Sequence, residues 1–149
     1  MVPIHFEGTF TINANRDKVW SYVTDPNKIA NCLPDLEKME TVDKTHFQAV
    51  FKIGISFIKS SFNFHIEFAE MNSPMKATIK ARGKGTGSIV DLTATMELSE
   101  APGGGTQMAW KADAMVGGTI AGVGSRLIGS TAEKKTAQFF ECLKGLIES

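Results

Sequence analysis

Alternation of apolar and polar positions with a period of two dominates most of this chain. Near the N-terminus, Ile4, Phe6, Phe10 and Ile12 alternate with polar residues. Such alternation is typical of a β-strand that buries one face. Similar runs occupy residues 36–42, 47–53, 62–68, 77–81, 90–98 and 108–114. The pattern therefore predicts about seven strands, joined by tight turns.

Two short segments with helical character separate the first strand from the second. Asn13 and Asn15 are both suitable N-caps for a helix over residues 16–24. A second helix over residues 26–33 opens with a proline and ends before Pro34, because the residue that precedes a proline disfavours the α conformation. We expect two small helices here.

The C-terminal part of the chain changes to helical spacing. From Thr119 onward, apolar residues form one broad stripe that predicts a long helix. Glycines interrupt its first third, and each costs a helix interior about 1 kcal/mol relative to alanine. Gly117, Gly118, Gly122 and Gly124 either leave space beneath the sheet for a guest molecule or let two backbones approach closely.

The order of these elements predicts one α+β domain over residues 1–149. One strand, two short helices, six strands and one long helix follow each other without a linker or repeat. A sheet with one apolar face has to cover that face, so it must curve around the single long helix. A strongly bent sheet leaves room beside the helix, and its inner face carries almost no ionisable group. Any cavity there would suit an apolar ligand.

Bulky apolar side chains at inner-face positions are the candidate ligand-binding residues. The alternative for each is ordinary core packing, which is the favoured interpretation for the two tryptophans. The candidates are Phe10, Trp20, Phe47, Phe51, Phe62, Phe64, Phe68, Ile79, Leu92, Met96, Trp110, Ile120, Val123 and Leu127.

The charge balance argues against nucleic acid as a partner. Sixteen basic and sixteen acidic residues give a formal net charge of zero, so no field gathers phosphates. Lys80, Arg82 and Lys84 form a small basic cluster, which is either a solvated face or a contact for an acidic partner.

Neither a metal site nor a cofactor site is predicted. His5, His46 and His65 lie on three different strands, and the alternation points His5 and His65 outward. Cys32 and Cys142 lack metal-ligand spacing, and we expect two reduced, mostly buried thiols. Charges interrupt every apolar run of the first 25 residues, so we expect no signal peptide, no membrane span and a cytoplasmic location.

No motif for catalysis stands out. Residues 83–87 are rich in glycine, but they lack the phosphate-loop pattern and fit a hairpin turn. No serine lies in a nucleophile-elbow motif, and alternation places Asp91 and Asp113 on the outer face. An enzyme is therefore the less favoured alternative, and it would require an acid or base inside the cavity.

Several short motifs follow one another in a recognisable order: Val19-Trp20, Asp25-Pro26, residues 29–34, Gly105-Thr106, residues 116–118 and residues 122–128. In these motifs, and over nearly its whole length, the chain resembles the family of the carbon monoxide dehydrogenase G subunit, within the superfamily of START-related and birch-pollen-allergen-like domains (SRPBCC). Members of that family usually carry glycine after the Leu-Pro pair, where this chain has Asp35.

The resemblance implies a helix-grip fold with a deep hydrophobic cavity for lipids, polyketides, sterols or other apolar ligands. It also implies an accessory protein for a molybdenum hydroxylase of the carbon monoxide dehydrogenase type, which recruits the enzyme to the membrane or handles a quinone-like electron acceptor. Three hypotheses stay open: a carrier of an apolar small molecule, an interaction protein without a ligand, and an enzyme of the cyclase or hydrolase kind.

Overall fold

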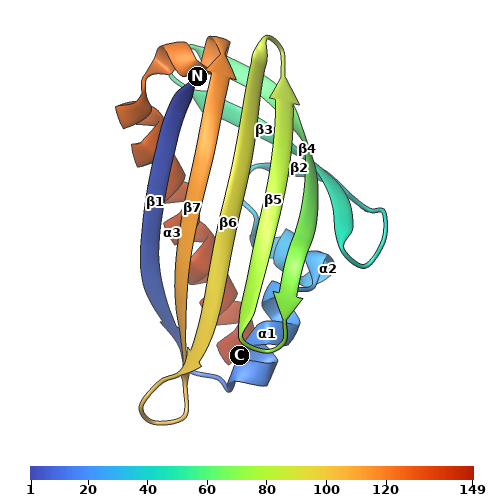
Figure 1. The fold of residues 1–149 in the computed structure, drawn as a ribbon, viewed down its shortest axis with the longest axis vertical. Helices are drawn as coiled ribbons and strands as arrows, with labels where there is room; N and C mark the ends of the chain where they lie inside the picture. The colour runs from blue at the N-terminus through green and yellow to red at the C-terminus, as the bar shows by residue number, and fades with distance from the viewer.

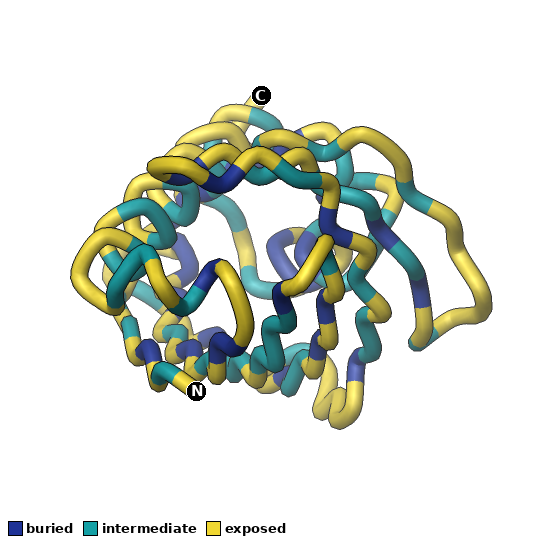
Figure 2. Tube along the Cα trace, turned by 90° about the horizontal axis from the view of Figure 1, so that it is seen from above, coloured by how far each residue is buried: buried dark blue, intermediate teal, exposed yellow.

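Seven strands form one antiparallel sheet in the order β1-β7-β6-β5-β4-β3-β2 (Figure 1). The computed structural model describes residues 1–149. Seen from above, the sheet forms a curved wall that returns toward the C-terminal helix (Figure 2). The predicted curved sheet is thus confirmed. The strands are β1 (Val2–Ile12), β2 (Leu36–Thr41), β3 (His46–Ile55), β4 (Ile58–Asn72), β5 (Lys76–Gly85), β6 (Ser88–Glu100) and β7 (Thr106–Gly118).

The two short helices after the first strand are also confirmed. Asn15, and not Asn13, caps α1 (Arg16–Val23), because its side chain accepts a hydrogen bond from the Lys18 amide at 2.8 Å. Asp25 caps the single turn of α2 (Pro26–Ile29), which continues as the 3₁₀ turn η1 (Ala30–Cys32). Both helices lie in the lower half of the molecule in Figure 1, behind the sheet.

The long helix begins later than the spacing predicts. Residues Thr119–Val123 form a separate 3₁₀ turn, η2, and α3 covers Ser125–Glu148. Gly118 and Gly124 adopt φ angles of 80° and 96°, a conformation that favours glycine, and these two residues bracket η2. None of the helices is long and apolar enough to cross a membrane.

The structure separates the two explanations for the glycines. A side chain at Gly118 would overlap the carbonyl oxygen of Gly87, so this glycine permits close backbone approach. At Gly122 the nearest atom to an added Cβ is the tip of the Phe57 ring at 3.9 Å, and Gly124 has no neighbour within 4 Å. Close backbone approach therefore explains Gly118 better than Gly122 or Gly124, whereas a side chain at Gly117 would meet the side chains of Ile89 and Met1.

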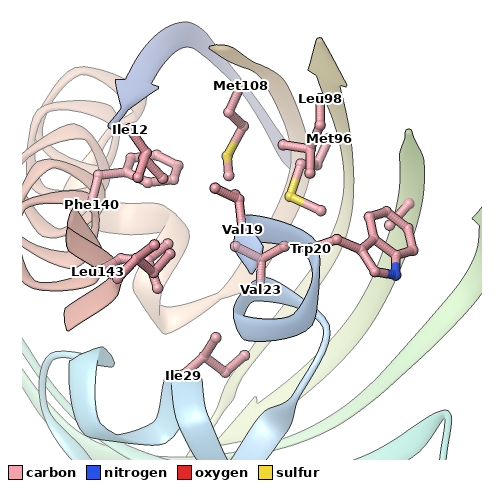
Figure 3. Packing of buried hydrophobic residues seen from close by; sticks show 12 residues of the cluster. Ile12, Val19, Trp20, Val23, Ile29, Met96, Leu98, Met108, Phe140 and Leu143 are labelled. Carbon is pink, nitrogen blue, oxygen red and sulfur yellow. The ribbon is translucent and has the colours of Figure 1, made fainter. Parts of the chain in front are cut away.

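Two separate hydrophobic clusters hold the sheet to the helices. The lower cluster joins α1, α3 and the lower ends of β6 and β7, with Trp20, Phe140 and Leu143 among its members (Figure 3). The upper cluster joins η2 to the upper strand ends through Phe62, Ile120 and their neighbours. No buried residue belongs to both clusters. Each end of the space between sheet and α3 thus has its own packed core.

The expectation of two free thiols is wrong. Cys32 at the end of η1 and Cys142 in α3 form a disulfide that spans 110 residues of sequence. The Nζ atom of Lys135 also lies 2.8 Å from the Oδ2 atom of Asp35, in the loop after η1. A covalent bond and an ion pair therefore tie α3 to the segment that leads into β2.

Candidate functional site

The inner face of the sheet is only partly covered between the two clusters. Ile66, Ile79, Leu92 and Ala94 lie at inward-facing positions of β4, β5 and β6, yet each remains half-buried. Inward-facing residues nearer the ends, such as Phe62, have no exposed surface. A solid interior would bury the middle of a sheet at least as well as its ends. These four positions are thus accessible on the concave side, although Phe47, Phe68, Ala81 and Ala112 in the same rows are buried.

The inner face is apolar in its chemistry. Inward-facing positions of β1 and β3–β7 between the clusters carry aliphatic or aromatic side chains or glycine. The polar residues of the inner face are three hydroxyl-bearing residues near the strand ends. Ser88 Oγ accepts a hydrogen bond from the Ile120 amide at 2.9 Å, Thr106 Oγ1 donates to the Ala14 carbonyl at 2.7 Å, and Ser60 Oγ donates to the Ser61 carbonyl at 3.4 Å. This surface offers shape and dispersion contacts to a ligand, and few directed polar ones.

All but one of the predicted ligand-binding residues lie in the lower cluster, in the upper cluster or on the sheet between them. The exception is Leu127, which is 42% exposed on α3 and joins neither cluster. Trp20 and Met96 belong to the lower cluster, with Phe10 and Trp110 packed against it. Phe62 and Ile120 belong to the upper cluster, with Phe64 and Val123 packed against it. Phe51 pairs with Phe62 at the level of the upper cluster, and Phe47, Phe68, Ile79 and Leu92 lie between the clusters.

Aromatic rings lie on the inner face both near β3 and β4 and near β1 and β7. The rings of Phe47 and Phe68 have centroids 5.9 Å apart. Phe6 and Phe140 were not among the candidates, yet each has its ring centroid 5.6 Å from that of Trp110. Both follow the periodicities that identified the others, so the signal for them was present in the sequence.

A hollow of about 1060 Å³ lies on the outer face of the sheet. Two adjacent rows of outward-pointing residues line it and cross six strands, and among the candidates only Phe47 and Leu92 border it. Apart from Lys80, its charged side chains pair with one another: the Nε atom of Arg82 lies 2.6 Å from Asp91 Oδ1, and His5 Nδ1 lies 2.6 Å from Asp113 Oδ1. The predicted outward orientation of both aspartates is confirmed. Because most of its charges pair internally, we do not assign a ligand to this groove.

His46 has a carboxylate on each side of its ring at one end of this groove. Its Nδ1 atom lies 3.0 Å from Asp43 Oδ1, and its Nε2 atom lies 3.0 Å from Glu67 Oε2. The hydrogen bond with Asp43 raises the pKa of His46 above its ordinary value of 6.5, and Glu67 adds to this. The backbone N–H of Thr45, followed by the His46 side chain, lowers the pKa of Asp43 to about 2.

These shifts predict how the turn between β2 and β3 responds to pH. The contribution of His46 to stability is fully present below pH 6.5 and is lost as pH rises through its raised pKa. The contribution of Asp43 is present above pH 3.8 and is lost as pH falls through about 2. Histidine NMR titration checks this: His46 should titrate above 6.5, and Asp43→Asn should lower its pKa. An unchanged pKa in that variant would contradict the assignment.

The architecture defines a START-like helix-grip domain. The structure superposes on a START superfamily protein from Mycobacterium smegmatis with a TM-score of 0.71 at 12% identity, over 97% of each chain. The Zhui aromatase/cyclase from Streptomyces sp. R1128 superposes with a TM-score of 0.71 at 15% identity, over 99% of this chain and 94% of that one. A conserved protein from Geobacillus kaustophilus is more similar, with a TM-score of 0.90 at 23% identity, over 97% and 95%.

Sequence comparison narrows the class to one family. The family model for the G subunit of carbon monoxide dehydrogenase (CoxG) matches residues 8–148, and the chain belongs to this family. No curated protein gives a significant match. Asp35, at the position where the resemblance implies a glycine, has a φ of 62°, in the left-handed region that glycine adopts most readily. The turn therefore keeps this conformation without the glycine.

Proposed function

We propose that this protein binds a hydrophobic small molecule, lipid-like or quinone-like, between the inner face of the sheet and α3. The observation that carries the proposal is the half-buried, apolar stretch of sheet between the two clusters. Burial of a ligand against it would remove apolar surface from water, at about 25 cal/mol per Å². The candidate residues between the clusters would contact the ligand directly, and those in the clusters would close the two ends.

The alternative of an enzyme has less support. General acid–base catalysis needs a titratable side chain within reach of the reacting group. The inward-facing strand positions between the clusters carry none, and the groups with shifted pKa values, such as His5 and His46, are exposed on the outer face. This distribution favours a carrier that takes up and releases its ligand unchanged.

Replacement of Ala94 by Phe tests the proposal, because the new ring would occupy the middle of the inner face. We expect the Kd for decylubiquinone, measured by quenching of tryptophan fluorescence, to rise at least about tenfold. The free energy of unfolding should change by less than about 1 kcal/mol, since an accessible surface accommodates a larger side chain.

The matched control is Thr93→Phe, one position earlier on the exposed outer face of β6. It should leave the Kd unchanged. If Ala94→Phe destabilised the fold by the roughly 1–3 kcal/mol typical of overpacking, the interior would be solid and the proposal would fail. The absence of any decylubiquinone or oleate binding by the unmodified protein would contradict it directly.

Association with a molybdenum hydroxylase of the carbon monoxide dehydrogenase type is a second candidate function, supported by the family assignment. Affinity purification of the tagged chain from native lysate of its own organism tests it. Recovery of a molybdenum-containing hydroxylase supports the association, and recovery of the chain alone contradicts it.

The cytoplasmic location is part of the proposal, and the disulfide bears on it. Disulfides persist mainly in oxidising compartments and are rare in the cytoplasm. The disulfide in the structure therefore counts against this location, and the redox state of the pair inside the cell decides the question. Alkylation of thiols in intact cells, followed by mass spectrometry, measures this. A fully oxidised pair would contradict the cytoplasmic location.

A further inference from the structure

The segment that contains η1 and β2, residues 30–41, lies at one edge of the inner face and is here called the closing segment. Cys32 is its only buried residue. Leu36 and Met39 of β2 are half-buried, and each pairs with an inward-facing residue of β3. Segments with so few buried contacts open locally at a low cost in free energy. The closing segment is thus a loosely packed part of the boundary of the proposed site.

Two side-chain links join the closing segment to α3. The disulfide connects Cys32 to Cys142, and the Nζ atom of Lys135 lies 2.8 Å from the Oδ2 atom of Asp35. The side chains of this ion pair are 41% and 43% exposed, so water screens the attraction between them and the link is weak. The covalent bond is therefore the stronger of the two links.

The two cysteines of the disulfide differ in exposure. Cys142 is exposed on α3, whereas Cys32 is 6% exposed. A thiolate attacks the disulfide sulfur that it can reach, the other sulfur leaves, and exposed disulfides are reduced more readily than buried ones. Neither cysteine belongs to the lower or the upper cluster. The bond can thus be attacked at Cys142 and cleaved without disruption of either cluster.

We propose that the Cys32–Cys142 disulfide is a site of thiol–disulfide exchange with a dithiol protein, and that its reduction releases the closing segment from α3. The proposed ligand then enters and leaves the inner face faster. This inference rests on the proposed carriage of an apolar molecule. With the disulfide intact, the closing segment and α3 stay together and the ligand is retained.

The exchange has two steps. A thiolate of the dithiol protein attacks the Sγ atom of Cys142, a disulfide forms between the two proteins, and Cys32 leaves as a thiolate. The second thiolate of the dithiol protein then attacks the sulfur of its own first cysteine and releases Cys142. Two electrons pass to the cysteine pair, which takes up two protons, and the dithiol is oxidised to a disulfide.

Trapping of the mixed disulfide tests the site of attack. The unmodified protein is mixed with a Cys-x-x-Cys oxidoreductase whose second active-site cysteine is replaced by Ser, so that the reaction stops after the first step. After rapid alkylation, peptide mass spectrometry should find the oxidoreductase attached to Cys142. Attachment to Cys32, or the absence of a mixed disulfide, would overturn the exchange site.

Stopped-flow measurement of decylubiquinone binding tests the effect on the ligand. The protein is reduced with dithiothreitol, which is removed before the quinone is added. We expect the association and dissociation rate constants both to rise at least about tenfold while Kd stays within about twofold, because a freed segment opens the path and leaves the site intact. Unchanged rate constants would overturn the proposal. A rise in the dissociation rate constant alone would also overturn it, because the site itself would then be deformed.

Far-UV circular dichroism of the reduced protein accompanies this measurement. The spectrum should match that of the oxidised protein, since both clusters stay packed. Loss of the folded spectrum on reduction would refute a local release of the closing segment.

Lys135→Gln removes the second link, and Lys134→Gln is the matched control at the neighbouring position of α3. Lys134 is exposed and forms no ion pair. In the reduced protein, Lys135→Gln should raise both rate constants by a further factor of about two, the size expected for an exposed ion pair. The control should leave them unchanged. Equal rate constants in the two variants would mean that the closing segment is not the part that moves.

Failure of this inference and failure of the carrier function give different results. If the unmodified protein binds no decylubiquinone, the carrier function is refuted together with the effect on the ligand, and the mixed disulfide alone decides the exchange site. If decylubiquinone binds with the same rate constants before and after reduction, the carrier function stands and the release of the closing segment is refuted.

Discussion

Replacement of Phe62 by Ala is expected to destabilise the protein by about 3–5 kcal/mol, the usual cost of removing a buried phenylalanine. Phe62 has no exposed surface, and it is a member of the upper cluster that fixes η2 to the sheet. Its ring occupies the space that a side chain at Gly85 would need, since an added Cβ there would lie 2.7 Å from a ring atom. The truncation would leave a cavity, because Gly85, which faces the ring, has no side chain to fill it.

Urea unfolding followed by far-UV circular dichroism measures this loss. Phe57→Ala is the matched control, because Phe57 lies in the same hairpin but is mostly exposed. The control should change the unfolding free energy by less than about 0.5 kcal/mol. Similar losses in both variants would mean that the upper cluster is not packed as described.

Loss of the Cys32–Cys142 disulfide has the second large expected effect. Replacement of either cysteine by Ser should lower the free energy of unfolding by about 2–5 kcal/mol, the range for native disulfides. The bond closes a loop of 110 residues, and a long loop gives the unfolded chain the largest gain in freedom when the bond is removed.

Three measurements separate this effect from local packing. The two single variants and the double variant should lose the same amount, because each lacks the same bond. A dithiol reductant should destabilise the unmodified protein to the level of the variants and should leave the double variant unchanged. If the reductant had no effect on the unmodified protein, the two thiols would not be paired in solution.

The strands were predictable because local sequence determines them. Each strand buries one face, so a period of two appears in the sequence wherever a strand lies, most clearly in residues 62–68. The start of α3 was not predictable, because helical spacing continues through η2. Only the φ angles of Gly118 and Gly124 mark η2 as a separate element. Periodicity shows which side chains share a face, and it does not fix where one helical geometry replaces another.

The remaining misses concern contacts between distant segments. Cys32 and Cys142 have no spacing that indicates a pair, and their proximity depends on how α3 packs beside η1. The candidate site was predicted as one set of inner-face residues, whereas the structure assigns them to two clusters and an accessible middle. The alternation identifies the face that a residue occupies, but the covering of that face depends on the curvature of the whole sheet.

The two edge strands of the sheet give α3 a special mechanical position. β1 and β2 lie at opposite ends of the strand order and do not pair with each other, and α3 contacts β1 on one side and η1, which leads into β2, on the other. An outward movement of α3 would break side-chain contacts and the Lys135–Asp35 ion pair, but no hydrogen bond between strands. The sheet can thus stay in place while α3 moves, and the disulfide limits the distance that α3 can move. Ligands of different width would then fit the proposed site without loss of hydrogen bonds between strands.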